Sequence, residues 1–312
     1  MRTVLAGDLG GTKCRYALVG EDFSVHRVQE VPTVREQGAF LQTFDAALAA
    51  VLRELPAGLA APTAAGFGAA GVVRPDGRAM LPAPNLPLGC VELAAHVQRT
   101  FGLSTTLLND GRASAWGEFL RGHAAGSDPL LCLFFGTGIG IGLIVDGKPY
   151  GGHANAAGEI GHTTFEPGGR PCPCGARGHF EAYCGGRAIT ERAAAEIGPP
   201  PGGKWTVGAV VATAATADAR AATARAILAD AERAAVTLVE NACTLLNPAA
   251  VVIGGGVATG WPQLRTRIEA WVRAHTTAPV HRELRFVESL GGSDAILWGA
   301  AAATGALWRP RT

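Results

Sequence analysis

The most constraining feature of this chain is a local plan that occurs twice: a short apolar run, a glycine-rich turn and a second apolar run. It occupies residues 4–19, where the turn is Gly10-Gly11-Thr12, and returns at residues 130–145, where the turn begins at Gly136. Short apolar runs on either side of a glycine turn are typical of strands joined in a β-hairpin. At 312 residues the chain is long enough to favour two domains over one. The repetition therefore predicts two related α/β halves around a cleft.

Apolar periodicity places the remaining elements. Phe40, Phe44 and Leu48 recur at helical spacing, for example, whereas Val251-Val252-Ile253 is a continuous apolar run that suits a buried strand. Further strands are expected at residues 25–31, 63–68, 105–108 and 251–253, and helices at residues 40–55, 91–101, 111–120, 218–246 and 294–307. Strands that alternate with helices in this way are typical of α/β domains.

Composition argues against several classes of partner. The formal net charge is +1 and no basic stripe is present, which argues against nucleic acid and an anionic membrane surface. Although 48% of the residues are hydrophobic, no apolar run approaches the roughly 18 to 20 residues that a membrane-spanning helix needs. The N-terminus enters a strand without the apolar segment of a secretory signal, and the 7 cysteines form an odd number. We therefore expect a cytoplasmic protein with free thiols rather than a disulfide framework.

Two cysteines and two histidines lie close together between residues 158 and 181. The candidate ligands are His162, Cys172, Cys174 and His179. Zinc takes thiolate and imidazole ligands tetrahedrally, and four protein ligands leave no open position for catalysis, so we expect a structural Zn²⁺. The alternative is a Cys-x-Cys loop that binds no metal.

The two glycine turns are candidates for phosphate binding. Glycine lets backbone N–H groups converge on an anion, and Thr12 or Thr137 adds a hydroxyl donor. The alternative is an ordinary hairpin turn that needs positive φ. Asp8 stands beside the first turn, where it either coordinates Mg²⁺ or caps the turn.

Asn109-Asp110 follows a predicted strand and opens a predicted helix. A carboxylate at such a strand end can accept a proton from a substrate hydroxyl. An aspartate at a helix start is also favoured simply as a cap, so the position alone leaves both roles open.

Taken together and in this order, these segments resemble the ROK family of sugar kinases and sugar-responsive repressors over nearly the whole chain. The run Asp8 to Lys13 is similar to the family's first phosphate motif, and Asn109-Asp110 is similar to its catalytic pair. Residues 136–142 resemble the second phosphate turn, and residues 252–256 the adenosine-side motif. The segment from Glu159 to Glu181 resembles the family's sugar and zinc signature.

The resemblance implies a site and a reaction. Asp110 is implied as the general base that takes the proton from the 6-hydroxyl of a hexose as that hydroxyl attacks the γ-phosphate of ATP. The family's glucokinases make glucose the first hexose to expect. Sugar hydroxyls are implied to be held by Gly71, Asn85, Asn109, Asp110, Glu159, His162 and Glu181. ATP and Mg²⁺ are implied to be held by Asp8, Gly10, Gly11, Thr12, Lys13, Gly136, Thr137, Gly138, Gly254, Gly255 and Gly256.

The family also implies the fold, which is that of the actin and hexokinase superfamily. Two ribonuclease-H-like domains are expected around a central cleft: a small one at residues 1–113, completed by the C-terminal helix at 294–312, and a large one at 114–293 that carries the zinc-binding loop 158–181. The implied partners are a small-molecule sugar and a second copy of the chain in a homodimer.

Two departures from the family pattern stand out. His179 replaces a frequent third cysteine, which leaves an equally competent ligand. Arg112 replaces a small or amide residue after the catalytic aspartate. The alternatives within the family are an N-acetylhexosamine, mannose or fructose kinase. A sugar-sensing repressor would need a DNA-binding domain ahead of Asp8, so we expect a kinase.

Overall fold

The computed structural model describes residues 1–83, 86–89, 91–200 and 202–308. Its contacts divide into two compact units. The first unit consists of Met1–Asp128, Gly142–Ala157 and the chain from Ser289 onward. The second unit consists of Pro129–Ile141 and Gly158–Glu288. The architecture is α/β, with two mixed sheets and flanking helices.

The first unit is built on a five-stranded sheet of order β3-β2-β1-β4-β5. Its strands are β1 (Thr3–Leu9), β2 (Lys13–Gly20), β3 (Val25–Pro32), β4 (Ala64–Ala69) and β5 (Ser104–Asn109). The strands β1 and β2 pair antiparallel, which confirms the predicted opening hairpin. In contrast, β1, β4 and β5 run parallel, so their carboxyl ends lie at one edge of the sheet.

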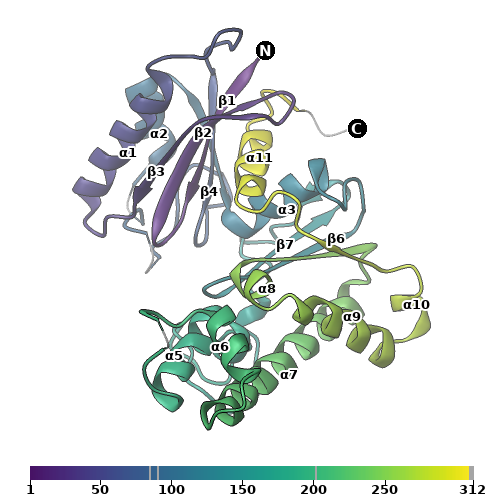
Figure 1. The fold of residues 1–312 in the computed structure, drawn as a ribbon. Coiled ribbons are helices and arrows are strands. Elements are labelled where there is room, and N and C mark those ends of the chain that lie inside the picture. Colours follow the sequence, from purple (N-terminus) through teal and green to yellow (C-terminus); the bar gives the residue numbers. More distant parts are fainter. Residues whose placement is uncertain (84–85, 90, 201, 309–312) are drawn as a thin grey trace. The chain divides into compact units, whose positions relative to one another are not determined.

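Helices cover both faces of this sheet (Figure 1). Leu5 and Leu9 of β1 face the core formed with α1 (Gln37–Leu52) and α2 (Leu93–Phe101), whereas Val4 and Ala6 face α11 (Asp294–Ala303). The alternation follows from the period of two along a strand. The helix α11 also packs closely on α3 (Asp110–Arg121), since a Cβ on Gly299 would lie 1.8 Å from the carbonyl oxygen of Ala113.

The boundaries of the units differ from the predicted boundary at residue 113. Residues 114–128 and 142–157 belong to the first unit, because α3 is one continuous helix and a division at 113 would cut it. The return of the chain begins at Ser289 rather than at 294. Glu118, fully buried in α3, accepts hydrogen bonds from the Ser289 hydroxyl and from the backbone N–H groups of Leu290 and Gly291.

The second sheet has the order β10-β9-β6-β7-β8. Its strands are β6 (Leu130–Phe135), β7 (Ile139–Val145), β8 (Lys148–Pro149), β9 (Ala250–Gly254) and β10 (Arg285–Glu288). The strand β9 pairs in parallel with both β6 and β10. The bounds of β6 are those predicted from its apolar run.

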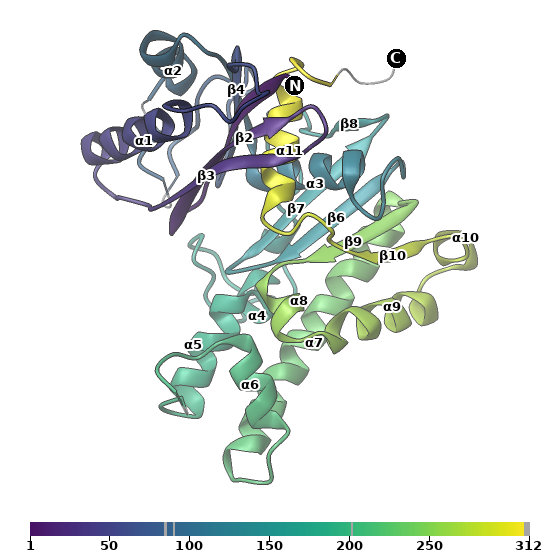
Figure 2. The same ribbon diagram turned by 45° about the horizontal axis from the view of Figure 1, so that its top comes forward.

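The helices of the second unit surround β6, β9 and β10. They are α4 (Glu181–Cys184), α5 (Gly186–Glu196), α6 (Val207–Ala214), α7 (Arg220–Leu246), α8 (Gly256–Gly260), α9 (Gln263–His275) and α10 (Ala278–His281), with a 3₁₀ turn η1 (Ile160–His162). Figures 1 and 2 show α7 and α9 on the same side of β6 and β9. The predicted alanine-rich helix is α7, and it ends where Asn247 adopts a left-handed conformation with φ of 43° ahead of Pro248.

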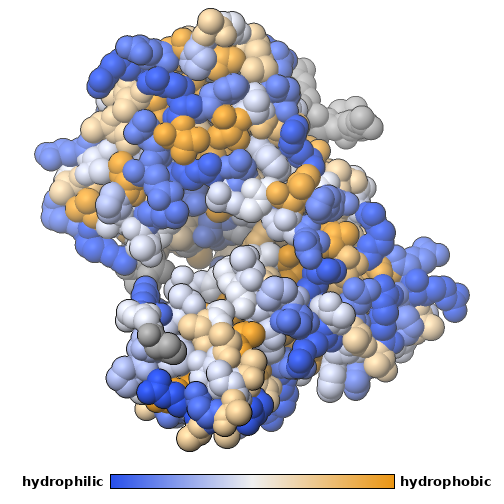
Figure 3. Space-filling view, in the orientation of Figure 1, coloured by the Kyte–Doolittle hydropathy of each residue, from blue (hydrophilic) through white to orange (hydrophobic). Residues whose placement is uncertain are grey.

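No helix in the described part of the chain has both the length and the apolar character needed to cross a membrane. On the face drawn in Figure 3, hydrophilic residues are spread over the surface of each unit. The apolar areas among these hydrophilic residues are small.

Candidate functional site

In the first unit, two aspartates lie at the carboxyl edge of the sheet. Asp8 lies in β1 opposite Gly68 of β4, and Asp110 follows directly after β5, whose last residue Asn109 lies opposite Ala69. Because β1 and β5 flank β4 in parallel, this register brings the two carboxylates to the same edge. The predicted base and the predicted magnesium ligand are thus neighbours.

The surroundings of Asp8 favour its protonated form. Burial raises the pKa of this carboxyl, and the nearby Asp110 raises it further, to about 7. Arg15 and Lys13 act in the opposite direction, but Arg15 donates to Asp294 at 2.5 Å and Lys13 donates to Glu30 at 2.7 Å. A bound cation would favour the charged form of Asp8, so this carboxylate fits the predicted Mg²⁺.

The helix cap of α3 is Asn109 rather than Asp110. The Asn109 side-chain oxygen accepts from the backbone N–H of Arg112 at 3.1 Å, and its amide nitrogen donates to the carbonyl of Gly71 at 3.1 Å. Asp110 is the first helical residue, and its Oδ1 accepts from the N–H of Gly111 at 2.8 Å. The capping role that competed with catalysis for Asp110 therefore belongs to its neighbour.

The segment around Gly71 is brought to the same place. Gly71 has φ of 135°, a backbone conformation that residues with a side chain rarely adopt. Its carbonyl accepts the hydrogen bond from the Asn109 amide. The predicted sugar ligand Asn85 lies outside the described residues.

The first glycine turn is tight, but neither Gly10 nor Gly11 has positive φ. A Cβ on Gly10 would lie 2.7 Å from the carbonyl oxygen of Lys13, so glycine is required for the close approach of backbone to backbone. The hydroxyl of Thr33 donates to the carbonyl of Gly10 at 2.6 Å and fixes the turn. The alternative for this segment, a hairpin turn that needs positive φ, therefore does not describe Gly10 and Gly11.

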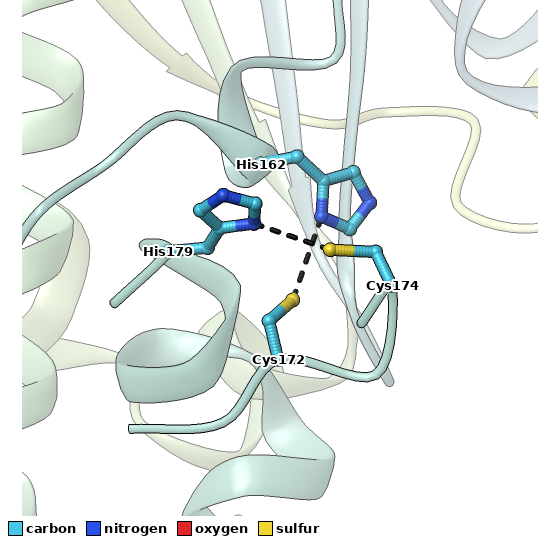
Figure 4. Close-up of side chains that lie close together, drawn as sticks. All are labelled: His162, Cys172, Cys174 and His179. Carbon is cyan, nitrogen blue, oxygen red and sulfur yellow. Dashed lines mark hydrogen bonds between the residues drawn. The ribbon is translucent and has the colours of Figure 1, made fainter. Parts of the chain in front are cut away.

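In the second unit, the structure brings the four predicted metal ligands together (Figure 4). The Nδ1 of His162 lies 3.6 Å from the Sγ of Cys172, and the Nδ1 of His179 lies 3.3 Å from the Sγ of Cys174. The four ligand atoms all lie within 4.8 Å of one another. Two sulfur and two imidazole nitrogen donors that converge in this way fit Zn²⁺.

The local backbone explains how the cysteines reach this arrangement. The N–H of Gly175 donates to the carbonyl of Cys172 at 3.0 Å, and the N–H of Cys172 donates to Ala176 at 2.8 Å. Gly175, at φ of 97°, supplies the left-handed residue that closes this turn. His179, the departure from the family pattern, directs its Nδ1 to the cluster as a third cysteine would direct its sulfur.

His162 uses its two ring nitrogens for different purposes. Its Nδ1 faces the cluster, whereas its Nε2 lies 3.9 Å from a carboxylate oxygen of Glu159, one turn earlier at the start of η1. A metal on Nδ1 would fix the orientation of the ring. The Nε2 of His162 and the Glu159 carboxylate would then be held near each other as two polar groups that a ligand can contact together.

Glu181 contacts the second glycine turn, which the sequence did not predict. Its Oε2 accepts from the N–H of Ile139 at 2.9 Å, and a Cβ on Gly138 would lie 2.2 Å from that oxygen. Neither Gly136 nor Gly138 has positive φ, so glycine at 138 makes room for the carboxylate. At the third glycine segment, Gly255 has φ of 92° and is the N-cap residue of α8, directly after β9.

The chain is similar to known proteins over most of its length. The model of the ROK family matches residues 4–306. A glucokinase of Streptomyces coelicolor is 33% identical over 195 residues, which cover 62% of this chain and 59% of that protein. An N-acetylmannosamine kinase of Shigella boydii is 33% identical over 197 residues, which cover 62% of this chain and 65% of that protein. The chain thus spans less than two thirds of the length of these relatives.

Solved structures match over a longer range. A ROK family glucokinase from Streptomyces griseus, in complex with glucose and AMPPNP, has a TM-score of 0.81 at 27% identity, with 97% of this chain and 99% of that chain covered. A ROK family transcriptional regulator, a homologue of the E. coli MLC protein, has a TM-score of 0.84 at 25% identity, with 98% of this chain and 78% of that chain covered. On these matches, the chain belongs to the ROK family.

Proposed function

We propose that this protein is an ATP-dependent sugar kinase that phosphorylates the 6-hydroxyl of a hexose, with glucose as the first candidate. The observation that carries the proposal is Asp110. It lies at the carboxyl edge of the first sheet beside Asp8, and Asn109 relieves it of the capping role. The glucokinase relatives support glucose as the acceptor.

Asp110 acts as the general base. One carboxylate oxygen is oriented by the N–H of Gly111, so the group is held in place by its own helix. The carboxylate accepts the proton of the 6-hydroxyl while the hydroxyl oxygen bonds to the γ-phosphorus and the bond from that phosphorus to the ADP oxygen breaks. Positioned bases of this kind contribute about 10² to 10⁴ in rate.

The nucleotide is assigned to the glycine turns. The backbone of Gly10 to Lys13 and of Gly136 to Gly138 would face the phosphates, and the segment from Gly254 to Gly256 the adenosine. Asp8 would hold Mg²⁺, which when bound would neutralise charge on the phosphates. The Lys13 ammonium is exposed and pairs with Glu30. This turn would therefore bind phosphate mainly through its backbone N–H groups.

Sugar recognition is assigned to carboxylates, amides and His162. The proposed set is Gly71, Asn85, Asn109, Asp110, Glu159, His162 and Glu181. Buried acceptors that lack a hydroxyl partner cost free energy, so such a set discriminates sugar stereochemistry. A structural Zn²⁺ on His162, Cys172, Cys174 and His179 would orient the His162 ring.

The test is a coupled assay of ADP release with glucose, mannose, fructose, N-acetylglucosamine and N-acetylmannosamine. The N-acetylated sugars are included because an N-acetylmannosamine kinase is as similar to this chain as the glucokinase is. Turnover with a hexose that disappears in Asp110→Asn supports the proposal. Sugar binding without any phosphorylation would instead favour a non-catalytic regulator, a candidate supported by the similar transcriptional regulator.

A homodimer and a cytoplasmic location stay predictions. Light scattering coupled to size-exclusion chromatography measures the first, because a dimer would have twice the mass of 31.9 kDa.

A further inference from the structure

We infer that Glu181 is a positioning residue for the second glycine turn, residues 136–139. The metal loop, residues 158–181, would then fix residues that contact the nucleotide as well as residues that contact the sugar. This inference rests on the proposed function, in which the turn receives phosphate. The starting observation is the hydrogen bond from the N–H of Ile139 to Glu181 Oε2, at 2.9 Å.

Three residues of the turn, Gly136, Thr137 and Ile139, are hydrogen-bonded to the segment that Glu181 opens. The N–H of Gly186 donates to the carbonyl of Gly136 at 2.8 Å, and the N–H of Arg187 donates to the carbonyl of Thr137 at 3.0 Å. With the bond from Ile139, these contacts join the whole turn to residues 181–187. Of the three, the Glu181 contact is the one made by a side chain, so it is the one that a substitution can remove.

The close fit at Gly138 supports the same role. The carboxylate of Glu181 occupies the space that a Cβ at residue 138 would need. Thr137, Glu181 and Arg187 line a pocket of about 300 Å³ together with Arg170 and Arg192, so the turn and the carboxylate face the same space.

The metal loop fixes the position of Glu181. His179 precedes it by two residues and forms a bridge with Thr164, and the N–H of Phe180 donates to the carbonyl of Thr163 at 3.2 Å. Phe180 is buried and its ring packs on Phe165, with centroids 5.1 Å apart. A metal on His179 would therefore fix the backbone before α4, which the buried Phe180 fixes already. The position of Glu181, the first residue of α4, would then be fixed as well.

The test compares Glu181→Ala with Glu181→Gln. Glutamine keeps an oxygen that can accept from Ile139, whereas alanine does not. Two quantities are measured without sugar: hydrogen exchange of the peptide that contains residues 136–139, and the affinity for a non-hydrolysable ATP analogue. We expect faster exchange and about tenfold weaker nucleotide binding in Glu181→Ala, with Glu181→Gln within about threefold of the wild type. Removal of the metal should change exchange in the same direction.

Glu191→Ala is the matched control. Glu191 lines the same pocket from α5, but within the described residues it makes no hydrogen bond to the turn, so exchange and nucleotide affinity should stay unchanged. Equal exchange in the wild type, Glu181→Ala and metal-free protein would overturn the inference. Tighter nucleotide binding in Glu181→Ala would also overturn it, because the carboxylate would then compete with phosphate. If wild-type protein binds no nucleotide, the proposed function fails, and the exchange measurement still decides the role of Glu181.

Discussion

Arg112 donates both terminal nitrogens of its guanidinium group to Asn155, one to the side-chain oxygen and one to the backbone carbonyl. The second of these bonds is 2.6 Å long, and Arg112 is 3% exposed. Asn155 in turn donates to the carbonyl of Val73 at 2.8 Å. Arg112 thus joins the start of α3, two residues after Asp110, to two other segments of the first unit.

Replacement of Arg112 by lysine should destabilise the protein. A lysine ammonium cannot reproduce the planar, two-pronged contact with Asn155 and would leave buried acceptors unpaired. We expect the free energy of unfolding to fall by about 2 to 3 kcal/mol, measured by chemical denaturation. Arg53→Lys, at an exposed helix end, is the control and should change little. An unchanged unfolding midpoint in Arg112→Lys would contradict the role described for this side chain.

Asp110→Asn should retain sugar binding but lose turnover. Asparagine keeps the shape of the side chain and the acceptor for the Gly111 N–H but cannot take up a proton at neutral pH. We expect turnover to fall by about 10² to 10⁴, while calorimetry shows sugar affinity near that of the wild type. Asp146→Asn is the control, because residue 146 lies in a turn at φ of 53°, which asparagine tolerates. Near-normal turnover in Asp110→Asn would remove this residue from the mechanism.

The stability of the ligand-free protein should depend on Asp8 in a defined pH window. The pKa of Asp8 is raised to about 7 in the folded state, from about 3.9 in an unfolded chain. The folded state therefore binds this proton more tightly, and the contribution of Asp8 to stability is present below about pH 4 and is lost as the pH rises through about 7. Asp8→Asn should consequently unfold at higher denaturant than the wild type at pH 8 and close to it at pH 4. The same difference at both pH values would show that the titration of Asp8 is not responsible.

Metal analysis checks the cluster of His162, Cys172, Cys174 and His179 directly. Purified protein should contain about one zinc ion per chain, measured by inductively coupled plasma mass spectrometry. Cys172→Ser should lose the metal and weaken sugar binding, because His162 is released, whereas His179→Cys should keep the metal. Cys243→Ala, in the buried face of α7, is the control and should leave the zinc content unchanged. Full activity in metal-free protein would refute a structural metal.

Local patterns predicted what depends on neighbours in the sequence. The apolar run of β6, the helix that begins at Asp110 and the four metal ligands all follow from spacing along the chain, and the roles of Asp8 and Asp110 came from the family resemblance. The bond from Arg112 to Asn155 spans 43 positions, and that from Ile139 to Glu181 spans 42. Single polar pairs at such separations leave no periodic signal. The return of the chain at Ser289 depends on a contact of the same kind, since Glu118 meets its partners 171 positions later.

The packing of Gly299 of α11 against Ala113 also bears on how the protein is made on the ribosome. The strand β1 is synthesised first. On one of its faces, however, Val4 and Ala6 pack against Leu297 and Trp298 of α11, which leave the ribosome almost last. The second unit, apart from residues 129–141, is a continuous stretch that is complete before α11 leaves the exit tunnel. The apolar face of the first sheet therefore stays exposed to solvent until α11 is synthesised, and during that interval it can bind chaperones or aggregate.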